Sequence, residues 1–449
     1  MANSALNRTL GTPTNADKWT WSAWIKRSKL SSSGVYMDVF AAYTDANNYA
    51  QISFHPDNYL FYYDQQGGAI KASLSTNRLF RDTSAWYHIM LATDTTQSTA
   101  ADRIKLYING TQYTWDRATT HPSQNQDTMI NKASTPHYVG QVGIGNFFDG
   151  YMSHVAFVDG QQLAPTSFGE TDSTSGIWKF KPPSGVTWGT NGAHFKFENS
   201  GNLGLDSSTN TNNWTVAGNL KQALDTPSDS YATFNPLNGV HYAGLGFTNA
   251  NSSMTTTAGQ YAPGLSSIGV NSGKWYAEFK MTSSSNWAMV GVTGQFATAT
   301  SYSIGHGTTG YGYTGGSSAS GQQSNNNNLS SYGDTYNNGD IIGIALDLDN
   351  HKLYFHKNGT YQNSGVPTSG STGTGAISIS TSPATGFYHM GAGNYSGSQT
   401  PSWSVNFGNG FFGTTAISSA GSNGNGSLFE YDVPSGYYAL NTKNINTYG

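Results

Sequence analysis

The chain has 449 residues, of which 10% are charged and 13% aromatic, and its formal net charge at pH 7 is -4. This small charge, without any run of Lys or Arg, argues against nucleic acid or an anionic membrane as a partner, and no segment approaches the roughly 20 apolar residues of a membrane span. The absence of Cys excludes disulfides, thiol catalysis and Cys-ligated zinc, while the 28 Tyr and 11 Trp argue against disorder.

Residues 1–165 are predicted to form a first antiparallel β-domain. Near its start, Trp19 and Trp21 alternate with Thr20 and Ser22, the period of a strand with one face on a core. Turn signals between the strand candidates are spaced as in a β-sandwich or jelly roll. The further candidates are Tyr36–Ala42, Tyr49–Phe54, Tyr59–Tyr63, Tyr87–Asp94, Ile104–Ile108, Tyr138–Gly145 and Gly150–Gly160.

Residues 166–240 change in character, because several Pro residues are spread through polar sequence. Trp178, Trp188 and Trp214 nevertheless give this region apolar surface to bury. We therefore predict a connector with a few strands, one of them at His194–Phe197, rather than a flexible linker.

Residues 241–420 are predicted to form a second β-sandwich, followed by a C-terminal tail at 421–449. The Asn-rich run at 315–331 and the segment 419–427 are both expected to be loops. The strand candidates of this domain are Gly273–Met281, Trp287–Thr293, Gly310–Tyr313, Gly339–Gly359 as a hairpin, Gly386–Met390 and Trp403–Phe407.

One hairpin pattern occurs in both domains. Trp86–Asp94 is followed by Arg103–Gly110, and Gly339–Asp349 is followed by Lys352–Gly359. Each copy closes on Asn-Gly, residues that accept positive φ and so permit a tight reversal. The predicted fold class is all-β, with two antiparallel β-sandwich (jelly-roll) domains joined by the Pro- and Trp-containing connector.

The second domain resembles the SPRY (B30.2-like) β-sandwich. The resemblance implies that Tyr311 and Tyr313 lie on a core strand. Six blocks match in the family's order: Gly273–Phe279, Val290–Val292, Tyr311–Tyr313, Gly339–Asp347, Leu353–Gly359 and Asn406–Gly408.

The first domain resembles a concanavalin-type jelly roll of the laminin-G-like kind, on Trp19–Ser28, Trp86–His88, Leu106–Gly110 and Phe148–Val155. With the segments Val158–Glu170, Gly204–Val216 and Leu224–Leu237, and the second sandwich behind them, the chain is similar to structural proteins of tailed bacteriophages. Fibre proteins commonly carry an N-terminal anchor or stalk, whereas here the jelly roll begins within the first twenty residues, which leaves attachment to the tail and attachment to the head as alternatives.

This resemblance implies a protein of the virion surface, assembled in the host cytoplasm with other virion proteins. We expect a tail-fibre or spike subunit that binds a host-surface receptor without catalysis. A glycan is the receptor that we favour over a protein. Weak sugar contacts favour multivalent display, so we expect a homo-oligomer, a trimer in the case of a fibre. The alternative is a capsid decoration, head-fibre or adaptor protein that uses its sandwiches for protein–protein assembly. A polysaccharide depolymerase ranks third.

Catalysis is not expected from the carboxylate pattern. Jelly-roll glycanases place an acid and a base or nucleophile on one strand face, as in Glu-x-Asp-x-Glu, and this spacing is absent. The nearest pair, Asp347 and Asp349, is expected to serve the adjoining turn. We predict no catalytic residue, with an active site assembled between chains as the open alternative.

No metal or other cofactor is expected. The histidines form no H-x-x-x-H pattern that would hold a transition metal. Laminin-G-like folds can hold calcium at loop oxygens, for which Asp45 with Asn47 and Asp94 with Asp102 are the candidates. Polar turns are the interpretation we favour for both pairs.

Ligand binding is expected at aromatic residues within the Gly-, Ser- and Asn-rich loops. Aromatic rings stack on sugar rings, while neighbouring amides and hydroxyls bond the sugar hydroxyl groups. The candidate residues are Trp287, His306 and Tyr395 in the second domain, and Trp115 and His55 in the first.

Overall fold

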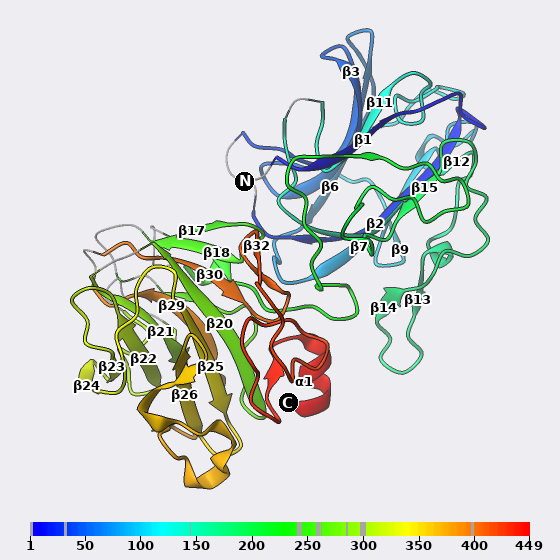
Figure 1. The fold of residues 1–449 in the computed structure, drawn as a ribbon. Helices are drawn as coiled ribbons and strands as arrows, with labels where there is room; N and C mark the ends of the chain where they lie inside the picture. Colours follow the sequence, from blue (N-terminus) through cyan, green and yellow to red (C-terminus); the bar gives the residue numbers. More distant parts are fainter. Residues whose placement is uncertain are drawn as a thin grey trace. The chain divides into compact units, whose positions relative to one another are not determined.

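The computed structural model describes residues 3–30, 34–143, 145–239, 245–256, 261, 263–283, 286–296, 302–396 and 399–449. The chain divides into two compact units, Met1–Gln222 and Ala223–Gly449 (Figure 1). Residues 166–240, the expected connector, fall on both sides of this division. The predicted all-β fold class with antiparallel sandwiches is confirmed. No helix within the described ranges has the length and apolar character needed to cross a bilayer.

Unit 1 is a sandwich of two main sheets, as far as its described residues show. The eight-stranded sheet has the order β10 (Ala118–Thr120), β6 (Ala69–Leu79), β5 (Tyr59–Gln66), β4 (Asn48–Phe54), β3 (Met37–Asp45), β11 (Pro136–Val139), β1 (Ala5–Thr9) and β16 (Thr215–Ala217). The six-stranded sheet has the order β15 (Ala193–Phe195), β12 (Gly150–Asp159), β2 (Lys18–Arg27), β7 (Trp86–Asp94), β8 (Ile104–Ile108) and β9 (Thr111–Tyr113).

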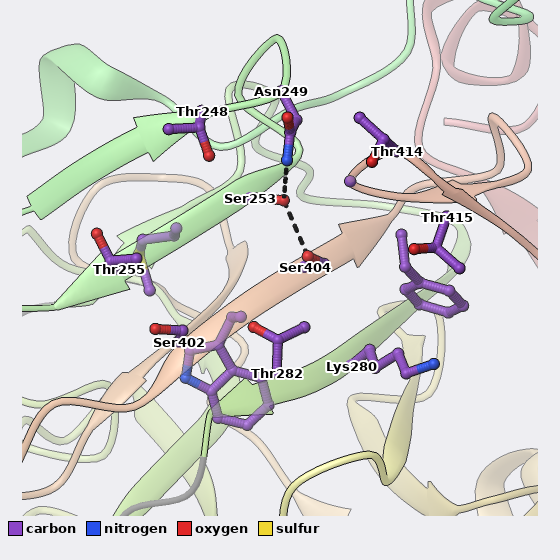
Figure 2. A pocket seen from close by; sticks show the side chains of 14 residues that line it. Thr248, Asn249, Ser253, Thr255, Lys280, Thr282, Ser402, Ser404, Thr414 and Thr415 are labelled. Atoms are coloured by element: carbon purple, nitrogen blue, oxygen red, sulfur yellow. Dashed lines mark hydrogen bonds between the residues drawn. The ribbon is translucent and has the colours of Figure 1, made fainter. Parts of the chain in front are cut away.

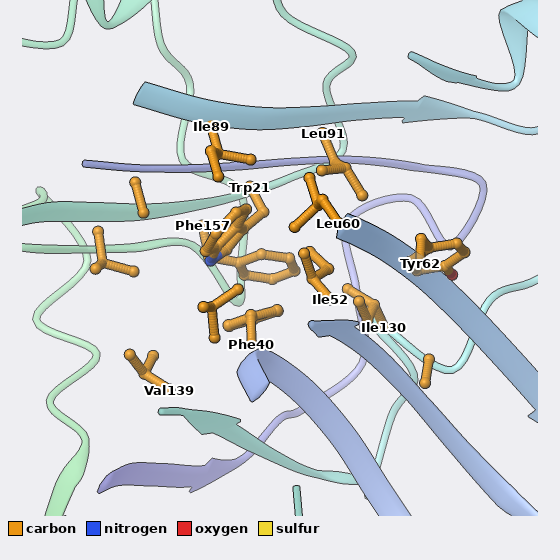
Figure 3. Close-up of a cluster of buried hydrophobic side chains, with 14 of the residues drawn as sticks. Trp21, Phe40, Ile52, Leu60, Tyr62, Ile89, Leu91, Ile130, Val139 and Phe157 are labelled. Carbon is orange, nitrogen blue, oxygen red and sulfur yellow. The ribbon is translucent and has the colours of Figure 1, made fainter. Parts of the chain in front are cut away.

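The core of unit 1 lies between these sheets, where aromatic rings pack among aliphatic side chains (Figure 3). Trp19 and Trp21 of β2 enter it, as their alternation predicts, and both are fully buried. The Trp21 ring lies 5.9 Å from that of Phe40, which lies 5.5 Å from that of Phe157. Each ring of this size stabilises the fold by about 1.5–3 kcal/mol through burial, so these contacts hold the two sheets together.

The outer face of the six-stranded sheet is covered by the segment that follows β12. This segment includes the hairpin of β13 (Gly169–Thr171) and β14 (Trp178–Phe180). The Trp178 indole N–H donates to His88 Nδ1 at 3.0 Å, and the two rings are stacked. Burial lowers the pKa of His88 to about 3, so its imidazole is neutral at physiological pH. Residues following the predicted first domain therefore belong to the packing of unit 1.

Unit 2 also has two main sheets within its described residues. The nine-stranded sheet has the order β17 (Leu245–Thr248), β18 (Ser253–Thr256), β30 (Ser402–Asn406), β20 (Lys274–Ser283), β25 (Ile341–Asp347), β26 (Lys352–Lys357) and β27 (Thr360–Tyr361), with β28 (Ile377–Ser378) on β26 and β33 (Tyr438–Ala439) on β20. The six-stranded sheet has the order β19 (Gly264–Leu265), β29 (His389–Asn394), β21 (Ala288–Thr293), β22 (Gly310–Gly315), β23 (Gln322–Asn325) and β24 (Asn328–Ser331).

The hairpin pattern shared by the two domains is confirmed. Strands β7 and β8 pair in unit 1, and β25 and β26 pair in unit 2. Both closing turns have positive φ at each central residue: 48° and 77° at Asn109 and Gly110, and 49° and 85° at Asn358 and Gly359. These are the dihedral signs of the two-residue turn that suits the twist of a hairpin. Tyr311 and Tyr313 are buried on β22, as the resemblance implies.

The prediction that residues 315–331 form a loop is wrong. The run contains β23 and β24, which pair as a hairpin with Asn325 opposite Asn328. Asn326 and Asn327 form its turn with φ of 50° and 59°. Asn tolerates the left-handed region because its side chain can bond locally, so the Asn run supplies a tight turn rather than an irregular loop.

The C-terminal segment packs on the outer face of the nine-stranded sheet. Phe429, Val433 and Tyr437 are buried there against Tyr276 and Tyr354. The chain ends in the helix α1 (Thr442–Tyr448), whose N-cap, Asn441, accepts a hydrogen bond from Asn444 N at 2.8 Å. Residues 421–449, expected to be a tail, thus cover the sandwich instead of extending from it.

The Asn109-Gly110 turn of unit 1 gives a test of its packing. A Cβ at Gly110 would overlap the Trp178 ring, and its φ of 77° is unfavourable for other residues. We expect Gly110→Ala to lower the free energy of unfolding of unit 1 by about 3 kcal/mol, from backbone strain and overlap together. Hydrogen exchange of β7 and β8 measures this separately from unit 2.

Gly67→Ala is the matched control. Gly67 also has positive φ, at 57°, but a Cβ there would meet no atom within 4 Å. Only the strain of about 1–2 kcal/mol is expected. Equal losses in the two variants would contradict the proposed role of Trp178.

Candidate functional site

The outer face of the eight-stranded sheet of unit 1 carries a row of aromatic side chains. On β5, Leu60 and Tyr62 point into the core, so Tyr59, Phe61 and Tyr63 point away from it. These three side chains are half-buried, whereas Leu60 and Tyr62 are fully buried. Large rings that remain in contact with water on a sheet face are available to a ligand.

The neighbouring strands extend this row across the sheet. Tyr49 of β4 lies 5.5 Å from the Tyr63 ring and 6.4 Å from that of Tyr43 on β3. Tyr36, just before β3, lies 5.6 Å from the Phe61 ring. With His55 at its end, this surface is named the tyrosine face, and it comprises Tyr36, Tyr43, Tyr49, His55, Tyr59, Phe61 and Tyr63.

Hydrogen bonds fix the polar groups of the tyrosine face. The Tyr63 hydroxyl donates to Gln65 Oε1 at 2.9 Å, and Gln65 Nε2 donates to the carbonyl of Ala46 at 3.0 Å. Burial and the nearby Tyr63 raise the pKa of Tyr49, so its hydroxyl stays protonated at physiological pH. The sheet therefore fixes the positions of these rings, and contacts between neighbouring rings support them. Such an arrangement suits stacking on successive flat groups of a ligand.

His55, a predicted site residue, lies at the end of the tyrosine face. The His55 ring is stacked on the Tyr59 ring, with 4.2 Å between the ring centres. The Arg117 guanidinium lies 4.1 Å from the centre of the same Tyr59 ring. Burial lowers the pKa of His55; the carboxylate of Asp57 opposes this and Arg117 adds to it. The imidazole is therefore neutral at pH 7, and the positive charge at this end of the face belongs to Arg117.

Trp115, the other candidate of the first domain, lies in the core of unit 1. Its side chain is 6% exposed, and its indole N–H donates to the Ile104 carbonyl at 2.9 Å. The residue stands in a polar loop, but its ring fills the sandwich interior. It does not join the tyrosine face.

The candidates of the second domain are brought together in part. Trp287 and Tyr395 are in ring contact at 5.4 Å. Tyr395 packs on a small cluster with Ile304 on the six-stranded sheet. His306 makes its ring contact with Tyr302 instead, at 4.1 Å, and its Nδ1 lies 2.9 Å from the side-chain amide nitrogen of Asn327. Trp287 and Tyr395 therefore form a half-buried aromatic pair, and His306 is not part of this pair.

Unit 2 also has a polar hollow of about 320 Å³ on the outer face of its nine-stranded sheet (Figure 2). Its floor is made by β18, β30 and β20, and its wall by the hairpin of β31 (Phe411–Phe412) and β32 (Thr415–Ala416). Hydroxyl side chains dominate the lining, which includes one cation, Lys280. We call this hollow the hydroxyl groove.

Of the carboxylate pair Asp347 and Asp349, Asp347 bonds the adjoining turn, as the sequence predicts, whereas Asp349 bonds the residue before β20. Asp347 is fully buried and pairs with Lys274 at 3.0 Å, while it also accepts hydrogen bonds from Asn350. Asp349 accepts from Gly273 N at 2.9 Å. Both carboxylates are thereby occupied by structural bonds.

The carboxylates of the two pairs considered for calcium bond other groups of the protein. Asp45 accepts from Asn47 N at 2.8 Å, and Asp94 pairs with Lys18 at 3.2 Å. Asp102 pairs instead with Lys105. No group of three acidic or His side chains that could hold a metal ion occurs among the described residues.

A further titratable cluster buried in unit 2 is centred on Glu278. His356 Nδ1 accepts from Gly359 N, so its Nε2 carries the proton and donates to Tyr276 Oη at 2.6 Å. Tyr276 donates in turn to Glu278 Oε1 at 3.1 Å. The backbone N–H groups of Glu430 and Tyr431 donate to the same carboxyl at 2.8 Å.

This Glu278 cluster fastens the C-terminal segment to the sheet. Glu278, Tyr276 and His356 are at most 1% exposed, so a substrate has no access to them. Burial raises the pKa of Glu278 to about 7 against the N–H donors that lower it, and burial lowers the pKa of His356 to about 3. The arrangement is therefore a structural clamp rather than an acid–base pair.

Sequence reasoning missed most of the tyrosine face and all of the hydroxyl groove. A signal for the first was present, because Tyr59, Phe61 and Tyr63 alternate within a predicted strand. No local signal marks the groove, since its Ser253, Lys280 and Ser404 come from strands far apart in the chain.

Comparisons with known families agree with both sandwiches. Residues 3–166 match the family described as the concanavalin A-like lectin/glucanases superfamily, and residues 274–382 match the SPRY domain. The chain contains a concanavalin-like domain and a SPRY domain. No curated protein matches the chain as a whole or in part. The bacteriophage origin, the virion location and the receptor stay predictions.

Three solved structures are similar to parts of the chain at low identity and low TM-score. The SPRY domain of human HERC1 is 20% identical with a TM-score of 0.26, covering 34% of this chain and 87% of its own. A heptameric SAP-like pentraxin from Limulus polyphemus is 17% identical with a TM-score of 0.27, covering 36% of this chain and 72% of its own. The PSpry domain of TRIM65 is 14% identical with a TM-score of 0.29, covering 39% and 91%.

The Glu278 clamp predicts a pH dependence of stability. The pKa of Glu278 is about 7 in the folded protein, above the ordinary value of 4.5 expected for the unfolded chain. The folded state therefore binds this proton more tightly, and the contribution of Glu278 to stability falls as the pH rises from about 4.5 to about 7. Glu278→Gln removes this titration. Relative to the variant, the wild type should lose about 3 kcal/mol of unfolding free energy across this window.

Calorimetric unfolding of the full chain at a series of pH values measures this difference. Lys274→Met, which removes the partner of the buried Asp347, is a control that leaves the Glu278 carboxyl in place. A difference between wild type and Glu278→Gln that does not change with pH would contradict the account.

Proposed function

We propose that the chain is a non-catalytic binding protein whose tyrosine face stacks on the sugar rings of a surface polysaccharide. The observation that supports this most is the row Tyr43, Tyr49 and Tyr63, with ring centres 6.4 and 5.5 Å apart on adjacent strands. Rings held at such spacings by a rigid sheet suit an extended ligand with successive flat apolar faces, which a polysaccharide has.

Polar groups beside the rings supply the remaining contacts that a sugar requires. The phenol hydroxyl of Tyr63 donates to Gln65 and can still accept, while Arg117 supplies donors at the other end of the face. Each ring contributes a modest stacking energy of about 0.5–1.5 kcal/mol, so several rings together are needed for useful affinity. A multivalent assembly would raise the avidity further.

A binding role without hydrolysis agrees with the carboxylates of the described residues. The carboxylate of Asp57 at the end of the tyrosine face pairs with Arg117 at 3.9 Å. Asp38, beneath the face, is fully buried and accepts from Ser53, and burial raises its pKa well above the usual range. Neither is placed beside a second free carboxylate as acid and base require.

The biological setting of this binding is part of the proposal. The resemblance of the chain to structural proteins of tailed bacteriophages supports a subunit of a tail fibre or spike that recognises a host-surface glycan. Display on the virion as a homo-oligomer, with other virion proteins as neighbours, would supply the multivalency that weak stacking needs.

Substitution of the central rings tests the proposed function. Tyr49→Ala and Tyr63→Ala should each weaken the binding of a surface polysaccharide about 5- to 10-fold, because each removes one stacking ring. The measurement is affinity electrophoresis of the full chain through gels that contain a panel of neutral and acidic bacterial surface polysaccharides, paired with a reducing-end assay.

Conservative and distant variants serve as controls. Tyr49→Phe keeps the ring and should retain most of the binding, while Tyr107→Ala changes a half-buried tyrosine on the opposite sheet and should leave it unchanged. Retardation that is insensitive to Tyr49→Ala and Tyr63→Ala, or reducing ends released from the polysaccharide, would contradict a non-catalytic tyrosine-face site.

A further inference from the structure

The hydroxyl groove of unit 2 is a polar cavity with a single charge among its described lining residues. That charge is Lys280, on β20, whose ammonium lies 5.8 Å from the centre of the Phe412 ring. None of the ion pairs formed within the described ranges involves Lys280. The ammonium therefore keeps donor capacity for an anionic group in the groove.

A chain of hydrogen bonds prepares the floor of the groove for a second contact. Asn249 Nδ2 donates to Ser253 Oγ at 3.1 Å, and Ser253 Oγ lies 2.9 Å from Ser404 Oγ (Figure 2). Whichever serine donates within this pair, the other keeps its hydroxyl hydrogen for a ligand. Ser404, on β30, is only 5% exposed, so its hydroxyl is held in place within the floor of the groove.

In the wall of the groove, the backbone of the β31–β32 hairpin passes close to the side chains of the floor. Gly413, at the turn between β31 and β32, has φ of 65°, and a Cβ there would lie 2.6 Å from Ser253 Oγ. Glycine at this position lets the hairpin stand beside β18 and makes a cavity of about 320 Å³. That volume lies at the lower end of the range of small-ligand sites.

The other side chains that line the groove favour an acidic sugar over a phosphate group as the anion. Hydroxyls both donate and accept, which matches the hydroxyl groups of a sugar, whereas phosphate sites gather several cations or backbone N–H groups. Here one ammonium is surrounded by hydroxyl side chains. The other lining hydroxyl residues are Thr248, Thr255, Thr282, Ser402, Thr414 and Thr415.

We propose that the hydroxyl groove binds a carboxylate-bearing sugar, a hexuronate, with the carboxylate on Lys280 and the sugar hydroxyls on the Ser253–Ser404 pair. This site rests on the proposed glycan-binding function but lies in the other unit from the tyrosine face. This proposal narrows the ligand class to an acidic polysaccharide. Its uronate residues would bind the hydroxyl groove, and its neutral sugar rings would bind the tyrosine face.

The test compares tetragalacturonate with its fully methyl-esterified form, which keeps the hydroxyls and loses the charge, and repeats the comparison with an oligoglucuronate. Titration calorimetry of the full chain should show the acids bound more tightly than the ester. Lys280→Met should weaken acid binding about ten-fold and leave the ester unchanged, because charge-assisted hydrogen bonds are the stronger ones. Lys280→Arg should restore the preference, and Ser404→Ala should weaken both forms.

Two controls separate this site from the tyrosine face. Lys352→Met changes a lysine of the same sheet that bonds Ser378 outside the groove, and it should keep the preference for the acid. Tyr49→Ala should keep it too. An acid preference that survives Lys280→Met, the binding of neither acid, or displacement of the acids by equimolar inorganic phosphate would overturn the proposal. Equal binding of acid and ester that is lost in Tyr49→Ala would overturn it while leaving the tyrosine-face function standing.

Discussion

The constraint on which the account depends is that a sandwich buries only the inner faces of its two sheets, so each outer face must be covered or must meet water. In unit 1 the Trp178 hairpin covers the six-stranded sheet, with its indole bonded to the buried His88. In unit 2 the C-terminal segment covers part of the nine-stranded sheet through the clamp on Glu278. The faces left over carry unusual chemistry: half-buried aromatic rings in unit 1 and a hydroxyl-lined hollow in unit 2.

In the proposed function, these two surfaces would divide the task of recognising a sugar polymer. The tyrosine face offers apolar area with little charge, which favours stacking and tolerates different sugars. The groove offers directed donors and one cation, which favour a particular charged residue. Most residues of both surfaces lie on strands, so their side chains are held by the sheet, and binding should cost little ordering entropy. The SPRY and concanavalin-like folds thus act as rigid supports whose outer faces differ in chemistry.

Much of the fold follows from local patterns in the sequence. The alternation at Trp19 and Trp21 and the two Asn-Gly turns specify strands and reversals whose geometry depends on few neighbours. The Asn-rich run at 315–331 misled the prediction because the same residues that favour loops also form the tight turn of a hairpin. Whether a loop aromatic is exposed depends on tertiary packing, which is why Trp115 is a core residue while His55 lies on the tyrosine face. The groove joins strands from distant parts of the chain, so only the pairing of β18, β30 and β20 reveals it.

Hydroxyl-radical footprinting of the full chain, alone and saturated with a polysaccharide that it retains, tests the central claim most directly. Oxidation of Tyr43, Tyr49 and Tyr63 should fall on binding, because the sugar covers their half-buried rings, while oxidation of Tyr107 on the opposite sheet should not change. Equal oxidation of the three tyrosines in the free and the saturated protein would contradict the claim that this face holds the ligand.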